Sequence, residues 1–197
     1  MSGWNDFLQS AGAQTDTRFG RHFGDLTQEA AATAGTTLMD AGHLGVIGIS
    51  GPDAETFLQG QLTCDVREVT ETCFRLGAWC SVKGRVQTSF WLAKAGDQYL
   101  LIMDGSLLAP IQVALKKYIL FSKATMTIRA DLAILGWHGD TALLAQSGLV
   151  IPAAQATASN GATCILNLGD RLLILCSEGE AQRLWQLPVT KAAQNAW

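Results

Sequence analysis

Two cations flank a glycine in the segment from Ser81 to Val86 (SVKGRV). The runs on either side, Cys73 to Cys80 and Gln87 to Ala93, have the composition of β-strands, so the segment is expected to be a turn at the end of a sheet. Arginine offers a planar fork that matches a carboxylate, and lysine offers a movable point charge. Lys83 and Arg85 are therefore candidates to hold an anionic ligand, while a solvated hairpin with charged edges would show the same pattern.

A second polar set lies in the segment from Leu58 to Val66. Gln61, Thr63 and Asp65 could form hydrogen bonds with a heterocycle. The alternative is the end of a helix followed by a turn, in which Thr63 and Asp65 bind backbone groups. Composition alone favours this structural alternative.

Aromatic and basic residues supply weaker candidates. Trp79 and Trp91 lie in the strands beside the Lys83 turn and offer flat faces for stacking on a ring, although a place in the core or on a sheet face is favoured for each. The segments Lys116-Lys117-Tyr118 and Phe121-Ser122-Lys123 either end a helix or bring positive charge to the same cleft.

No catalytic constellation is evident in the sequence. The three histidines are scattered, and neither GxGxxG nor a P-loop occurs. The cysteines show no CxxC spacing, so neither a zinc site nor a redox motif is indicated, and reduced thiols are expected. These cysteines are Cys64, Cys73, Cys80, Cys164 and Cys176.

The composition is that of a globular protein. The chain has 197 residues, of which 48% are hydrophobic and 16% charged, enough for a sizeable core. No apolar run approaches the roughly 18 residues that span a bilayer, and the first residues do not read as a signal peptide, so a cytoplasmic protein with no membrane partner is expected. The net charge of −3 argues against a broad nucleic-acid surface.

The order of the expected elements is β-α-β-β-β-α-β, an elaborated split βαβ arrangement. Pro52 and Asp53 suit the first turn of a helix, and Ser106 suits the cap of the next one. The elements are the strand Leu44–Ser50, a helix after Asp53, the strands Cys73–Val82, Arg85–Ala93 and Tyr99–Met103, a helix from Ser106, and the strand Ala124–Ile128.

The same order begins again after residue 130, which indicates an internal duplication. The second set is the strand Leu132–Trp137, the helix Asp140–Ser147, the hairpin Thr163–Leu168 and Arg171–Cys176, and the helix Glu178–Gln186. We therefore expect an α+β fold with an N-terminal segment (1–37), a first α+β half (38–130) and a second, incomplete half (131–197). Within the N-terminal segment, residues from Thr27 are expected to start a helix.

Three ordered segments carry a family resemblance. Phe57 to Val66 (FLQGQLTCDV), Cys80 to Phe90 (CSVKGRVQTSF) and Leu115 to Met126 (LKKYILFSKATM) together resemble the YgfZ folate-binding proteins, which are relatives of the aminomethyltransferase (T-protein) of the glycine cleavage system. The likeness runs from about Leu38 to Trp137.

The resemblance implies a fold, a ligand and a role. The fold would be a folate-binding domain of two ferredoxin-like halves with antiparallel sheets, here without the C-terminal β-barrel. The ligand would be tetrahydrofolate or a derivative, bound by Lys83, Arg85, Gln61, Thr63, Asp65 and Thr88, with no metal. The role would be to support iron–sulfur cluster assembly or repair in client enzymes, including enzymes of tRNA modification.

Two departures from the family pattern bear on chemistry. The T-protein relatives have an acidic pair after the equivalent turn, where this chain has Thr88 and Ser89, and neither can act as a carboxylate base. The YgfZ branch has a Lys-Gly-Cys core followed by Gly-Gln-Glu, which the sequence up to Trp197 does not contain. Either a truncated form or a shortened relative would explain this.

Three functional hypotheses remain open at this point. A binding and accessory protein, with no catalytic residue of its own, would hold a folate between the two halves. A folate-dependent aminomethyltransferase is the alternative, which the Thr88-Ser89 pair disfavours. A non-catalytic interaction module that has lost its ligand is the third.

Overall fold

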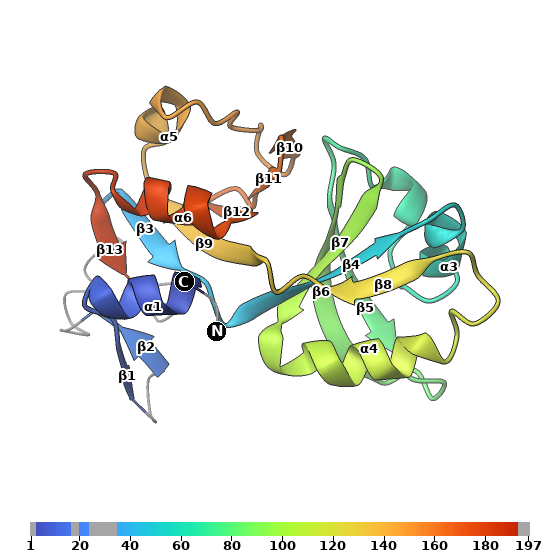
Figure 1. Ribbon diagram of the computed structural model, residues 1–197. Coiled ribbons are helices and arrows are strands. Elements are labelled where there is room, and N and C mark those ends of the chain that lie inside the picture. Colours follow the sequence, from blue (N-terminus) through green and yellow to red (C-terminus); the bar gives the residue numbers. More distant parts are fainter. Residues whose placement is uncertain (1–2, 17–19, 24–34, 193–197) are drawn as a thin grey trace. The chain divides into compact units, whose positions relative to one another are not determined.

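The computed structural model describes residues 3–16, 20–23 and 35–192 (Figure 1). The chain folds into two compact units. The central unit consists of His43–Ala130 with Gln155–Thr157, and the terminal unit consists of Met1–Gly42, Asp131–Ala154 and Ala158–Trp197. The helix expected to start at Thr27 lies outside the described residues.

The central unit has the expected order of elements. Its five strands form one sheet in the order β5-β6-β7-β4-β8, and every neighbouring pair is antiparallel. The elements are β4 (Leu44–Ser50), α3 (Ala54–Gln59), a 3-10 helix (Val66–Glu68), β5 (Arg75–Cys80), β6 (Val86–Ala95), β7 (Gln98–Asp104), a 3-10 helix (Gly105–Leu107), α4 (Leu108–Lys116) and β8 (Thr125–Ile128).

This order contains two split βαβ arrangements. Strands β4 and β6 run in the same direction with β7 between them, and β7 and β8 run in the same direction with β4 between them. Strand β5 extends the sheet at one edge. The predicted ferredoxin-like half is therefore confirmed for the central unit.

Apolar side chains at alternate strand positions point to one face of the sheet, and helices cover that face. Ile47, Leu101 and the helix residues Ile111 and Leu115 belong to one buried apolar cluster, because every second residue of a strand points to the same face. Figure 1 shows α4 running alongside the sheet. Gly45 permits this approach, since a Cβ at that position would overlap Leu108.

The terminal unit repeats the topology with one strand added. Its sheet has the order β10-β11-β12-β9-β3-β13, in which β3 lies between the strands that correspond to β4 and β8. The elements are α1 (Gly3–Ser10), β1 (Gln14–Asp16), β2 (Gly20–His22), β3 (Thr37–Asp40), β9 (Leu132–His138), α5 (Ala142–Gln146), β10 (Thr157–Asn160), β11 (Thr163–Asn167), β12 (Arg171–Ser177), α6 (Glu178–Trp185) and β13 (Thr190–Ala192). The described strands form open sheets and no closed barrel.

The structure groups the N-terminal residues differently from the expected division at residues 38 and 131. Strand β3 pairs antiparallel with β9 and parallel with β13, which ties it to the terminal sheet. From α1, Trp4 and Leu8 are buried in the core of the same unit, where the rings of Trp4 and Trp185 lie 5.6 Å apart in an edge-to-face contact. The physical reason is burial, because an isolated α1 of eight residues would be marginal in water.

Candidate functional site

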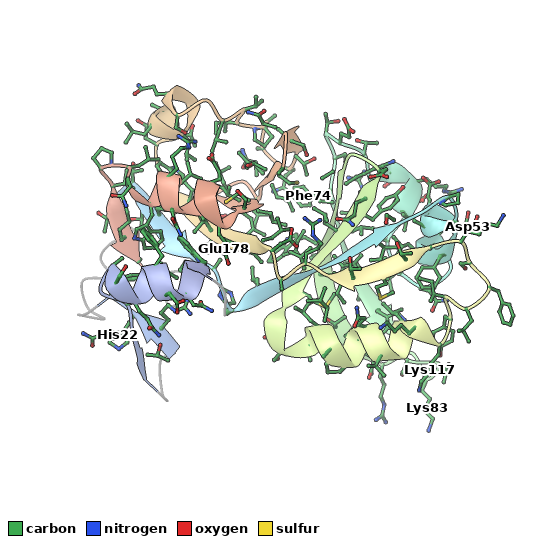
Figure 2. The ribbon with its side chains drawn as sticks, viewed as in Figure 1. His22, Asp53, Phe74, Lys83, Lys117 and Glu178 are labelled. Atoms are coloured by element: carbon green, nitrogen blue, oxygen red, sulfur yellow. The ribbon has the colours of Figure 1, made fainter. Side chains whose placement is uncertain are left out.

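The predicted cationic turn is present. The amide of Ser81 donates to the carbonyl of Arg85 (2.8 Å), the amide of Gly84 donates to the carbonyl of Ser81 (2.8 Å), and Gly84 has a positive φ of 72°. Lys83 and Arg85 are exposed, and neither is paired with a carboxylate in the described part of the chain. In Figure 2 the side chain of Lys83 extends away from the body of the unit.

A pocket opens where β6 and β7 separate. These strands pair from Ala95↔Gln98 to Trp91↔Ile102, and nearer its start β6 pairs with β5 alone among the described residues. Continuing the register would bring Ser89 opposite Asp104. The gap between the two strands is therefore lined by backbone and side chains from both.

The pocket is small and mostly apolar. Its volume is about 220 Å³, below the roughly 300–1,000 Å³ of pockets that enclose a whole drug-sized ligand. It can therefore enclose one ring system of a larger ligand. The lining residues are Leu44, Leu76, Thr88, Ser89, Phe90, Trp91, Met103, Asp104 and Leu107.

Thr88 is the predicted site residue that lines this pocket. It is buried, and its hydroxyl lies 3.1 Å from the carbonyl of Ser89, to which it donates. Trp91 also lines the pocket and is half-buried, so part of its ring faces the pocket space. Thr88 and Trp91 lie three residues apart on β6, on opposite faces of the strand.

Two of the other predicted polar residues form hydrogen bonds with neighbouring parts of the protein. Thr63 is tied to β5, because its Oγ1 accepts a hydrogen bond from the amide of Ala78 (2.8 Å) and its own amide donates to the carbonyl of Ala78 (3.0 Å). Asp65 caps the 3-10 helix and pairs with Arg67 (2.7 Å), and the hydrogen bonds from Arg67 lower the pKa of Asp65 to about 2. Gln61 is half-buried at the end of α3. None of Gln61, Thr63 and Asp65 lines the pocket, and their part in ligand binding stays a prediction.

The basic and aromatic segment after α4 is exposed. Lys116, Lys117 and Tyr118 are exposed at the helix end, and the side chain of Phe121 is 99% exposed. Trp79, by contrast, is partly buried and packs against the core cluster of the central unit. Trp79 therefore packs against the core, as the sequence favoured.

The terminal unit has a pocket beside the residue that corresponds to Asp104 in the repeat. Asp104 at the end of β7 pairs with the first residue of β4, and Ser177 at the end of β12 pairs with the first residue of β9. A pocket of about 430 Å³ lies beside Ser177, and its lining is polar where that of the central pocket is apolar. It is lined by Ser147, Gly148, Leu149, Asn160, Thr163, Ser177, Glu180 and Arg183.

Curated relatives share the sequence of most of this chain. The tRNA-modifying protein YgfZ of Shigella boydii serotype 4 (strain Sb227) is 33% identical over 161 residues, which cover 79% of this chain and 49% of that protein. Over these residues the chain is homologous in sequence to YgfZ. The tRNA-modifying protein YgfZ of Escherichia coli (strain SE11) matches with the same identity and coverage. The chain spans about half the length of the curated relatives it matches, and no protein-family model matches it.

Solved structures confirm the predicted fold of the chain. The glycine cleavage system aminomethyltransferase T from Bartonella henselae has a TM-score of 0.78, with 20% identity, over 92% of this chain and 54% of that chain. A heterotetrameric sarcosine oxidase from Corynebacterium sp. U-96 has a TM-score of 0.51, with 16% identity, over 79% of this chain and 84% of that chain. At these identities the likeness concerns the fold alone.

The cysteines are reduced, and the part of the chain that the structure describes holds no cluster of metal-binding side chains. All five cysteines are free, and burial raises the pKa of Cys164 to about 11 and that of Cys176 to about 12. In residues 3–16, 20–23 and 35–192, no group of three His, Cys, Asp or Glu side chains could hold a metal ion. Over the same residues, the helices are too short or too polar to cross a bilayer.

Proposed function

We propose that this YgfZ homologue is a cytoplasmic tetrahydrofolate-binding accessory protein that supports iron–sulfur cluster assembly or repair in client enzymes, including enzymes of tRNA modification. The observation that carries the proposal is the position of an apolar pocket and a cationic turn on one strand. The pocket takes the ring of the folate, and Lys83 and Arg85 attract the carboxylates of its tail.

The spacing along β6 suits a ligand with a flat ring and an acidic tail. Arg85 precedes β6 directly, and Ser89 lines the pocket four residues later. At about 3.3 Å per residue, the two positions are roughly 13 Å apart along the strand. The small pocket volume also suits such a ligand, because a ring enclosed in the pocket leaves the acidic tail outside.

Calorimetric titration with a reduced folate tests the proposal. Replacing both Lys83 and Arg85 by Ala removes two charge-assisted contacts. Because both side chains are exposed and solvent screens them, each is worth about 0.5–1.5 kcal/mol, so binding should weaken roughly 5- to 150-fold. The Lys116→Ala, Lys117→Ala variant removes the same charge from an exposed helix end and should bind as the wild type does.

A pocket variant gives an independent test. Ser89→Trp places a large side chain at the mouth of the pocket and should abolish binding, while leaving the buried residues Thr88 and Phe90 unchanged. Undetectable binding to the wild-type chain at millimolar folate would refute the proposal. Binding that survives both the Ser89 and the Lys83/Arg85 variants would also refute it.

The aminomethyltransferase alternative has the fold in its favour, through the likeness to aminomethyltransferase T. Against it, the hydroxyls of Thr88 and Ser89 cannot serve as a carboxylate base. Incubation with an aminomethyl donor and tetrahydrofolate should therefore give no turnover. Measurable transfer would favour this alternative over an accessory role.

A further inference from the structure

Asp104 is the charged residue among those that line the central pocket. It ends β7, and the chain turns from it into the 3-10 helix that precedes α4. Its Oδ1 accepts hydrogen bonds from the amide of Ser106 (2.8 Å) and from the hydroxyl of Ser106 (2.6 Å). One carboxylate oxygen is thus held in place by the following turn.

The second oxygen, Oδ2, takes no such bond from the described residues and belongs to a side chain that is exposed at the pocket. The hydrogen bonds from Ser106 lower the pKa of Asp104, and the charge of nearby His43 acts in the same direction. The group is therefore an anion near neutral pH. It faces apolar walls in which Thr88 and Ser89 are the polar side chains.

Comparison of the two units shows that capping the next helix at this position does not require a charged residue. Ser177 occupies the equivalent position in the terminal unit and caps α6, because its side chain accepts a hydrogen bond from the amide of Glu180. A serine is therefore enough to start the helix that follows. The negative charge of Asp104 exceeds what capping requires, and in a pocket its natural partner is a ligand with N–H donors or a positive charge.

We propose that Asp104 determines which ring the central pocket accepts, because its Oδ2 accepts a hydrogen bond from an N–H donor at the edge of a heterocycle. The 2-amino group on the amino-pyrimidinone edge of a reduced folate offers such a donor. The proposal rests on the proposed function, since it names the group that reads the ring of the same ligand. In the β6–β7 gap, a ring beside Ser89 would present one edge to Asp104 on the opposite strand.

Two ligands and three variants test this role by calorimetry. The ligands are a reduced folate and its analogue in which methyl replaces the 2-amino group. Asp104→Asn and Asp104→Ser remove the charge and keep a residue that caps helices well. Asp97→Asn is the matched control, because it removes an exposed carboxylate from the turn at the other end of the β6–β7 hairpin.

The wild-type chain and Asp97→Asn should prefer the amino ligand by roughly 10- to 150-fold, the range for a hydrogen bond to a charged group. In Asp104→Ser the preference should fall to within about threefold, and Asp104→Asn should lie between. A full preference retained in both Asp104 variants, with folate still bound, would overturn this inference and leave the proposed function standing. No folate binding by the wild-type chain would overturn both.

Discussion

Replacing the residues of one buried ion pair tests whether the N-terminal segment is part of the terminal core. Asp40 on β3 is 2% exposed and accepts two hydrogen bonds, from Nε1 of Trp4 (3.2 Å) and from Nη1 of Arg21 (2.5 Å). Arg21 also donates to Oδ1 of Asn5 (2.8 Å). One carboxylate therefore connects α1, β2 and β3.

The two partners differ in exposure, and this difference sets the expected magnitudes. The side chain of Arg21 is 26% exposed and that of Asp40 is 3% exposed. Arg21→Ala leaves a buried carboxylate without its counter-charge and should lower the free energy of unfolding by about 3–5 kcal/mol. Asp40→Ala leaves the Trp4 donor unsatisfied, but Arg21 can reach water, so about 1–3 kcal/mol is expected.

Urea unfolding followed by tryptophan fluorescence measures both changes, since Trp4 and Trp185 lie in the same core. Arg67→Ala is the control, because it breaks an exposed arginine–aspartate pair in the central unit and should cost less than about 1 kcal/mol. The reasoning fails if Arg21→Ala costs no more than this control, or if Asp40→Ala is the more damaging of the two.

Three further outcomes are expected. Gly77→Ala should lower the free energy of unfolding by about 1–3 kcal/mol in urea titrations, because its new Cβ would lie 2.9 Å from the Phe90 ring. Cys164 and Cys176 should stay unmodified by iodoacetamide in the native protein at about pH 8, as mass spectrometry would show, because burial raises the pKa of both thiols. Burial, aided by a hydrogen bond to a carboxylate, raises the pKa of Tyr99 to about 12, above its ordinary value of about 10. The fold favours the neutral phenol, so its contribution to stability is complete below about pH 10 and is lost as the pH rises toward 12, which unfolding measured against pH would detect.

Local patterns predicted most of the strands and helices. Runs such as Leu44–Ser50 and Tyr99–Met103 are continuous and apolar, and a turn bounds each, so both were found as β4 and β7. Strand β3 was not found, because Thr37–Asp40 is four residues long and is defined by partners more than ninety residues away in the sequence. Such a pairing leaves no local period in the sequence.

The residues of the candidate site also differ in whether local sequence could reveal them. Thr88 was found through the resemblance, while Asp104 was missed, although a signal for it existed. The Gly96-Asp97 turn fixes the register of the β6–β7 hairpin, and counting back from that turn places Ser89 opposite Asp104. Leu44 could not be found in this way, because it reaches the pocket only through the pairing of β4 with β7.

The pocket itself follows from the topology. In a split βαβ arrangement, the chain must leave the end of the inner strand to begin the crossover helix, so β7 stops at Asp104 while β6, which has ten residues, continues past it. A pocket also lies beside Ser177, where β12 gives way to α6, although residues after α5 and on α6 line it in place of a continuing strand. Since both units have a pocket beside the departing strand, the side chains that line it decide what each one can bind. An anion among apolar walls in the central unit and a set of hydroxyl, amide and paired charged groups in the terminal unit cannot serve the same ligand.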